Sequence, residues 1–297
     1  MRKALFLLFI LYSYSITVLS QSSNKFSFIY MADVHYNEER GGGQALQKAL
    51  DTIHTMNPDF ILIGGDIVYD VMRESSSDKA EALCRSFLSQ ISGIPYPVYY
   101  AIGNHEHFSL YNRKVNINHP LFGKKLYEKY FGKRYYSFDH KGWHFITLDD
   151  MVITPDRKYI GKVDSIQISW LKEDLAQIDD QTPIVVTAHV PLITTLSQWY
   201  GGGTNANTNK IAIENTDEVL NVFKNKNLKL ILQGHIHYFE VLNILNKTTV
   251  ISAPSFSGKW WMGKQHGMEE GFVRINITQD DQLEYEYIDY GWDPVEK

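Results

Sequence analysis

Short apolar runs alternate with longer amphipathic segments along most of this 297-residue chain. Apolar runs of strand length, bounded by turn-forming residues, are typical of buried strands. They predict strands at 26–31, 60–63, 98–101, 184–188 and 228–232. Apolar residues at helical spacing predict helices at 44–56, 79–91, 165–178 and 217–226.

Two other regions have the strand pattern without intervening helices. Residues 133–148 are typical of a hairpin, with a polar turn at 140–142. Further strand-like runs follow at 241–245, 249–252, 272–277 and 283–288. Alternating strands and helices, followed by a strand-rich end, predict an α/β fold with two mixed sheets. The sequence contains no internal repeat or linker, which indicates a single domain over residues 21–297.

Each of the five central strands runs directly into residue types that bind metals. In chain order these residues are Asp33 and His35, Asp66, Asn104, His189, and His235 and His237. Because ligands bind outside the carboxyl ends of strands in open α/β sheets, we expect all of them to converge on one edge. The i, i+2 spacing of the first and last pairs predicts, for an extended chain, that both members point to one side.

The donor types and their number fit a pair of metal ions. Carboxylate, amide oxygen and imidazole together suit Mn, Fe or Zn better than Mg or Ca. Two ions with four protein ligands each, one of them a shared carboxylate, would use all seven residues. A glycine precedes Asp66, Asn104 and His235, where the backbone must turn sharply or approach a ligand closely. The sequence therefore predicts a dinuclear metal centre.

The order of these residues resembles the calcineurin-like metallophosphoesterases, whose pattern is D-x-H, G-D, G-N-H-D/E, H and G-H-x-H. All five blocks are present between residues 33 and 237. The resemblance implies a four-layered α/β/β/α sandwich of two mixed sheets flanked by helices. By position, it implies one metal ion bound by Asp33, His35, Asp66 and His237, and a second bound by Asp66, Asn104, His189 and His235, with Asp66 bridging.

The same resemblance implies a hydrolase of phosphate monoesters or diesters. Two metals about 3.5–4 Å apart can acidify a shared water and clamp both oxygens of an in-line displacement. We expect the resulting hydroxide to attack phosphorus while the metals, Asn104 and His105 stabilise the developing charge. His105 has no place in either ligand set, so we expect it to act as the general acid for the leaving oxygen. His107 matches no block, and no role is expected for it.

The sequence differs from the motifs of two better-defined branches of this family, and these differences narrow the expected activity. The arginines that accompany two blocks in protein Ser/Thr phosphatases are missing, which argues against that activity. Tyr69 has the G-D-x-x-Y spacing by which purple acid phosphatases place a tyrosine on ferric iron. Here His35 stands where those enzymes have glycine, so we expect Tyr69 to be a pocket wall, and a purple-acid-like monoesterase remains the alternative. Asp70 or Glu106 could orient His105, and the sequence does not decide between them.

Substrate choice would depend on the long loops at 36–43, 108–120, 191–210 and 254–271. Their aromatic residues are candidates for stacking on a base or sugar: Tyr36, Trp199, Tyr200, Trp260 and Trp261. The D-x-H form with G-N-H-E resembles cyclic-nucleotide phosphodiesterases and broad phosphodiesterases or nucleotidases. A non-catalytic metal-binding module of the same fold is the alternative from a different functional class.

Composition and charge exclude some partners. The formal net charge of -5 gives no basic surface for a nucleic-acid duplex. Cys84 is the only cysteine, so there is no disulfide framework or thiolate metal site, and we expect it to be a core residue.

The first twenty residues have the pattern of a secretory signal peptide. Arg2 and Lys3 precede an apolar run, and small residues precede an expected cleavage after Ser20. A secreted or periplasmic location is therefore expected, with no stable membrane span after cleavage. If the signal stays uncut, a membrane-tethered protein is the alternative.

Overall fold

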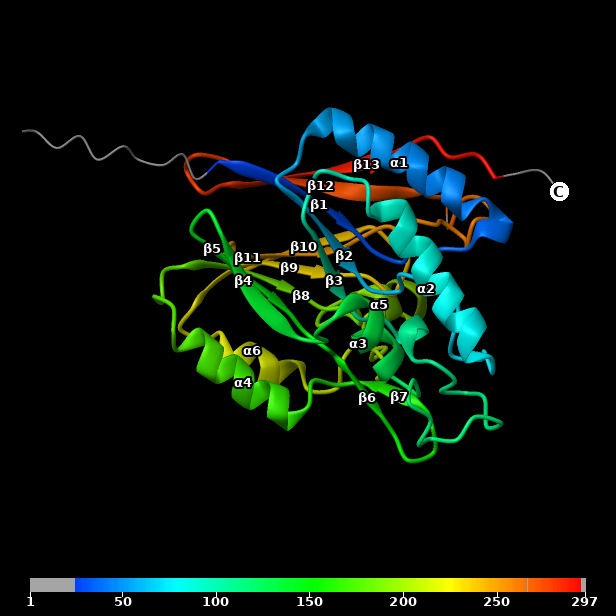
Figure 1. Cartoon of the computed structure of the whole chain (residues 1–297). Coiled ribbons are helices and arrows are strands. Elements are labelled where there is room, and N and C mark those ends of the chain that lie inside the picture. Colours follow the sequence, from blue (N-terminus) through cyan, green and yellow to red (C-terminus); the bar gives the residue numbers. More distant parts are fainter. Residues whose placement is uncertain (1–24, 266, 295–297) are drawn as a thin grey trace, which may run out of the picture.

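The computed structural model describes residues 25–265 and 267–294. Two mixed β-sheets pack face to face, and helices cover the outer face of each (Figure 1). Helices α1 (Gly42–Met56) and α2 (Ser77–Ile91) cover the first sheet, whereas α4 (Ser165–Leu175) and α6 (Thr216–Val222) cover the second. The expected α/β/β/α sandwich is therefore confirmed. The predicted signal peptide lies outside the described residues.

The first sheet has the strand order β13-β12-β1-β2-β3. Its members are β1 (Phe26–Met31), β2 (Phe60–Gly64), β3 (Val98–Ala101), β12 (Gly271–Ile277) and β13 (Leu283–Asp289). β1, β2 and β3 run parallel, so their carboxyl ends meet at one edge. β12 pairs antiparallel with β1, and β13 pairs antiparallel with β12.

The second sheet has the order β10-β11-β9-β8-β5-β4. Its members are β4 (Tyr136–His140), β5 (Trp143–Thr147), β8 (Pro183–Thr187), β9 (Asn227–Gln233), β10 (Glu240–Ile244) and β11 (Thr248–Ser252). The four central strands, β5, β8, β9 and β11, run parallel. Both sheets therefore contain adjacent parallel strands, which places several strand ends at one edge of each.

Alternation along the strands creates a core between the sheets. Phe26, Phe28 and Tyr30 of β1 are buried in the cluster that also contains Phe145 of β5. The ring of Phe28 stacks on Phe60 with a centroid distance of 4.8 Å and an interplanar angle of 13°. The alternate residues of β1 instead join the larger cluster that includes the helices. Burial on both faces explains why all residues of this strand except Ser27 are apolar.

The predicted helices and strands are present, with ends that shift by up to a few residues. α4 and α6 end before the predicted 178 and 226. β3 was expected to be buried, but it is an edge strand and three of its four residues are only half-buried. The pattern also missed α3 (Lys125–Phe131), α5 (Leu196–Gly201) and the pair β6 (Met151–Ile153) and β7 (Tyr159–Gly161). These elements are too short to show a clear hydrophobic period. Cys84 is buried as expected.

Among the described residues, no helix has the length and apolar character needed to cross a membrane.

Candidate metal centre

The seven predicted donors follow the carboxyl ends of β1, β2, β3, β8 and β9, and these ends meet between the two sheets. Asp33, His35, Asp66, Asn104, His189 and His237 are buried, and His235 is half-buried. Their ligand atoms form two neighbouring groups. Within each, three nitrogen or oxygen atoms lie within 4.8 Å of one another.

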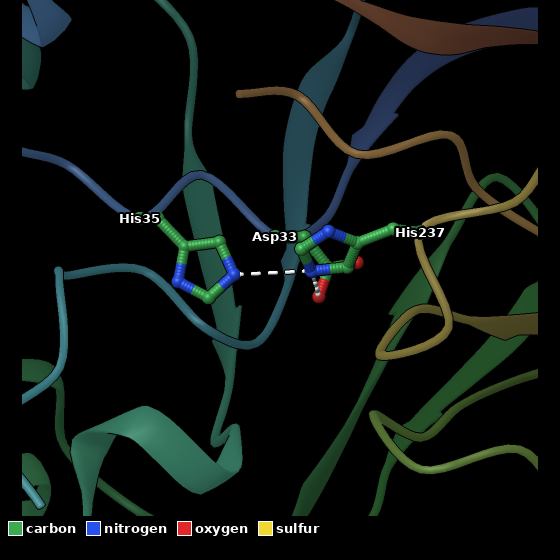
Figure 2. A group of neighbouring side chains, drawn as sticks. All are labelled: Asp33, His35 and His237. Carbon is green, nitrogen blue, oxygen red and sulfur yellow. Dashed lines mark hydrogen bonds and ion pairs between the residues drawn. The ribbon is translucent and has the colours of Figure 1, made fainter. Parts of the chain in front are cut away.

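The first group consists of Asp33, His35 and His237 (Figure 2). His35 Nε2 lies 3.1 Å from His237 Nε2, and His237 Nε2 lies 3.3 Å from Asp33 Oδ1. Two imidazole nitrogens that point at the same space repel each other through their lone pairs unless a proton or a cation lies between them. The Nδ1 atoms of both rings are buried without a hydrogen-bond partner in the described part of the chain. The two converging Nε2 atoms and one carboxylate oxygen are therefore a suitable donor set for a cation.

The second group consists of Asp66, His189 and His235, with Asn104 beside it. His189 Nε2 lies 3.2 Å from Asp66 Oδ2 and 3.3 Å from Asn104 Oδ1. His189 Nδ1 bonds the carbonyl of Gly64 at 2.8 Å, and His235 Nε2 bonds the carbonyl of Lys210 at 2.7 Å. Because each carbonyl requires an N–H donor, the other nitrogen of each neutral ring is left as an acceptor, as in metal-bound histidines.

Asp66 lies between the two groups. Its Oδ2 atom is 3.2 Å from His189 Nε2 and 3.7 Å from His35 Nε2, which belong to different groups. One carboxylate oxygen therefore faces both donor sets. This arrangement fits the bridging position that the resemblance implies for Asp66, and the oxygen and nitrogen donors fit Mn, Fe or Zn.

The local backbone is not the extended chain expected from the i, i+2 spacing. Asp33, His35, Asp66, His235 and His237 all have positive φ values, between 42° and 70°. Each left-handed residue costs about 1 kcal/mol or more. Asp33 and His35 join the same group, whereas His235 and His237 join the two different groups, as the expected ligand sets require. A concentration of such residues is typical of functional sites.

Two glycines allow the loops to approach one another. Gly65 has a φ of 91°, and a Cβ atom there would lie 2.5 Å from Nδ1 of His189. A Cβ atom on Gly103 would lie 2.1 Å from the backbone nitrogen of Asp66. The glycines before Asp66 and Asn104 are thus required by close packing within the site itself.

The electrostatics favour positive charge at this position. Burial alone would lower the pKa of His189, but the Asp66 carboxylate outweighs it and raises the pKa to about 10. Burial would raise the pKa of Asp66, but the nearby rings of His189 and His105 hold it well below its usual value. The buried Asp66 carboxylate therefore attracts positive charge to this position, and a metal cation bound here would leave the His189 ring neutral.

His105 lies between the two groups, with its ring centroid 4.5 Å from that of His35, and one of its ring nitrogens lies within 4.8 Å of donor atoms of His35 and Asp66. Its Nε2 is 3.9 Å from Asp66 Oδ2, and its Nδ1 is 3.9 Å from Asp70 Oδ1. The Glu106 oxygens instead accept backbone N–H groups, including those of Ile67 at 2.7 Å and Gly103 at 2.8 Å. Of the two acids considered for orienting His105, the structure places Asp70 next to the ring and uses Glu106 to hold the loop around Asp66.

The aromatic residues considered for substrate binding differ in their distance from the donor groups and in their burial. Tyr36 is fully buried, its ring packs on Phe87 of α2, and its hydroxyl bonds Glu38 at 2.9 Å. The expectation that Tyr36 lines a substrate pocket is therefore wrong. Trp260 lies beside the first group, with its ring 5.0 Å from that of His237.

Two further aromatic candidates line clefts. Trp199 on α5 is 81% exposed and lines a small cleft with Ile236 and Tyr238. Tyr69 lines another cleft together with Asp70 and lies under the guanidinium of Arg40, 5.0 Å from its ring centroid.

Sequence reasoning missed two buried acids, Asp149 and Asp150, which follow β5. Asp149 is paired with Lys124, at 2.6 Å, and with Arg134. Neither carboxylate oxygen of Asp150 has a hydrogen-bond partner in the described part of the chain. Burial raises the pKa of Asp150 to about 7, although the nearby His189 opposes the shift. An acid directly after a strand was the available signal, but β5 was counted only as half of a hairpin.

Comparison with known proteins decides the family. The model of the calcineurin-like phosphoesterases matches residues 26–239. The chain belongs to this family.

The relatives are distant. A probable cyclic nucleotide phosphodiesterase of Fibrobacter succinogenes is 24% identical over 65% of this chain and 63% of that protein. Purple acid phosphatase 23 of Arabidopsis thaliana is 30% identical over 39% of this chain and 22% of that protein. The chain therefore spans less than two thirds of the length of these curated relatives.

Among solved structures, the chain resembles a dimetal phosphatase from Danio rerio. The TM-score is 0.60 at 14% identity, covering 90% of this chain and 99% of that one. A purple acid phosphatase from yellow lupin (Lupinus luteus) gives a TM-score of 0.59 at 15% identity, covering 91% of this chain and 52% of that one. At these identities the likeness shows the fold alone.

Proposed function

We propose that this chain is an exported, metal-dependent phosphoesterase that hydrolyses phosphate monoesters or diesters with a pair of Mn, Fe or Zn ions. The observation that carries this proposal is the position of Asp66. A single oxygen of this carboxylate faces His35 of one donor group and His189 of the other, at 3.7 and 3.2 Å. One ion would be held by Asp33, His35, Asp66 and His237, and the other by Asp66, Asn104, His189 and His235.

The residues around the ions would each have a separate role in the reaction. When bound, a pair of metal ions lowers the pKa of a water and neutralises charge on the phosphate. His105 lies next to His35 and Asp66, and because seven other donors would complete the two ligand sets, we assign it to protonate the leaving oxygen as the phosphorus–oxygen bond breaks. Asp70 Oδ1 lies 3.9 Å from Nδ1 of His105, and a hydrogen bond between the two would orient the ring.

A purple-acid-like monoesterase would require Tyr69 as an additional iron ligand. His35 already supplies a donor to the first group, and the Tyr69 ring is covered by the Arg40 guanidinium. These observations favour Tyr69 as a cleft wall. Purified protein loaded with iron would test this directly, because a tyrosinate–iron charge-transfer band in the visible spectrum would support the alternative.

The decisive experiment separates an enzyme from a metal-binding module. Protein stripped with a chelator would be reloaded with Mn, Zn or Fe and assayed on mono- and bis-p-nitrophenyl phosphate. We expect nitrophenol release that depends on added metal and is lost in Asp66→Asn. Metal binding without release from either ester would support the module, and release that persists in the stripped protein would contradict the proposal.

The proposal that the chain is exported depends only on the sequence of residues 1–20. The test is N-terminal sequencing of the protein from the culture medium or the periplasm. We expect the chain to begin near Gln21. A protein that retains Met1 and sediments with membranes would contradict the proposed location.

A further inference from the structure

Trp260 forms one wall of the candidate centre. Its ring centroid lies 5.0 Å from that of His237 and 5.9 Å from that of His35. The side chain is half-buried, so part of the ring is open to solvent beside the donor groups. An aromatic face beside a polar site can stack on a flat ring of a bound ligand.

The backbone holds the Trp260 ring in place in a conformation that costs free energy. Trp260 and Trp261 are consecutive residues in the left-handed region, with φ values of 50° and 68°. Bulky residues rarely adopt this conformation, and it persists only where the surrounding contacts enforce it. The indole N–H of Trp261 donates to the carbonyl of His35 at 2.8 Å, and its backbone N–H donates to Ser257 at 2.7 Å.

The segment before Trp260 is fixed to the first donor group as well. The hydroxyl of Ser257 donates to the carbonyl of Asp33 at 2.9 Å, and that of Ser255 does so at 3.2 Å. Trp261 is buried against Phe256. Trp260 is therefore positioned relative to Asp33 and His35 before any substrate arrives, and such preorganisation lowers the entropic cost of binding.

The charge around Trp260 restricts which ligand groups can stack on its ring. Arg40 donates from Nη1 to the backbone carbonyl of Trp260 at 3.2 Å, which brings a guanidinium to this wall. A positive charge here disfavours a cationic group such as trimethylammonium, although tryptophan alone would attract it. An uncharged flat ring that is part of an anionic ester meets no such repulsion.

We propose, on the basis of the proposed phosphoesterase function, that Trp260 is a specificity-determining residue that stacks on a flat aromatic ring carried by the substrate. The preferred substrates are esters whose alcohol carries such a ring, either a nucleobase or an aryl group. Stacking of a base on an aromatic side chain strengthens binding by about tenfold or more.

Two substrate pairs test this with matched leaving groups. Uridine 5′-phosphate and ribose 5-phosphate differ in the base, and benzyl phosphate and cyclohexylmethyl phosphate differ in the flatness of the ring. Each would be used as the monoester or as its methyl diester, whichever the enzyme hydrolyses. Hydrolysis of the ring-free members tests the proposed function independently of the stacking.

For the natural sequence we expect kcat/KM to favour the flat-ring member of at least one pair by about tenfold. Trp260→Leu should abolish this preference by lowering kcat/KM for the flat-ring member more than for the ring-free member, whereas Trp260→Phe should retain part of it. The pair that shows the effect identifies the source of the ring. Trp170→Leu, at a half-buried tryptophan on α4, is the matched control and should change neither member.

Binding provides a readout besides activity. Uridine 5′-phosphate should quench the intrinsic tryptophan fluorescence more strongly than ribose 5-phosphate, and Trp260→Leu should remove the difference. The proposal is overturned if no flat-ring preference exists, if Trp199→Leu rather than Trp260→Leu removes it, or if Trp260→Leu lowers metal content and every activity equally.

Discussion

Glu106 holds the backbone of Asp66, because its Oε2 atom accepts the Asp66 N–H at 3.0 Å. The same carboxylate also accepts the N–H groups of Ile67, Val68 and Gly103. Four donors that converge on one buried acid fix the loop between β2 and the following turn. The acid that follows Asn104 and His105 in the sequence thus positions the carboxylate that faces both donor groups.

We expect Glu106→Gln to weaken metal binding by about 10- to 100-fold, the usual effect of removing a support of a ligand. The amide nitrogen of glutamine would face backbone N–H donors and could not accept from them. Titration of the metal-free protein with Mn²⁺, followed by elemental analysis, measures the affinity. Glu81→Gln, on the surface of α2, should bind as the natural sequence does, and unchanged affinity in Glu106→Gln would refute the supporting role.

Much of the fold could be predicted because the strand pattern is simple. β1 is buried on both faces, so five of its six residues are apolar. The donors could be predicted because each follows a strand. The burial of Tyr36 and the position of Trp260 could not, because both depend on tertiary contacts: the first on packing against Phe87 and the second on a left-handed backbone held by distant carbonyls.

His105→Ala should retain both metal ions and lose about 10²- to 10⁴-fold in kcat, the usual contribution of a general acid. Elemental analysis and turnover, measured on the same preparation, test this. Asp70→Asn should cause a smaller loss, since it removes only the carboxylate next to Nδ1 of His105. If His105→Ala loses its metal, then His105 is a ligand and the role proposed for it is wrong.

The ion pairs of Asp59 should make stability depend on pH. Burial would raise the pKa of Asp59, but hydrogen bonds from Lys141, the Ser27 backbone and His140 outweigh it and lower the pKa below the ordinary 3.8. Because the folded-state pKa is the lower one, the stabilisation is present above about pH 4 and is lost as the pH falls through the folded-state value. These bonds connect the β4–β5 turn to the start of β1 and β2.

We therefore expect Asp59→Asn to lower the free energy of unfolding by about 1 kcal/mol at pH 7 and by much less at pH 3. Urea denaturation at the two pH values measures the difference. Asp51→Asn, at an exposed position on α1, is the control and should have little effect at either pH. A loss at pH 3 as large as that at pH 7 would show that the ionised carboxylate is not the cause.

Phe60 lies at the centre of the aromatic core between the sheets. Its ring contacts those of Phe28, Phe138 and Phe145, at centroid distances of 4.8, 5.7 and 5.2 Å. Phe60→Ala should cost about 3–5 kcal/mol of unfolding free energy, because the surrounding rings cannot fill the cavity. Phe60→Leu should cost less, and Ile166→Ala, at a side chain that is 74% exposed, should stay within about 0.5 kcal/mol. Urea denaturation would contradict this account if Phe60→Ala and Ile166→Ala were equal.

The most direct test of the account is the position of bound metal. A crystal of protein loaded with Mn²⁺, measured at the manganese absorption edge, should show two anomalous peaks about 3.5–4 Å apart, one on each side of Asp66. One peak should lie among Asp33, His35 and His237, and the other among Asn104, His189 and His235. A fully loaded crystal with a single peak, or with manganese bound elsewhere, would contradict the claim that Asp66 joins two metal sites.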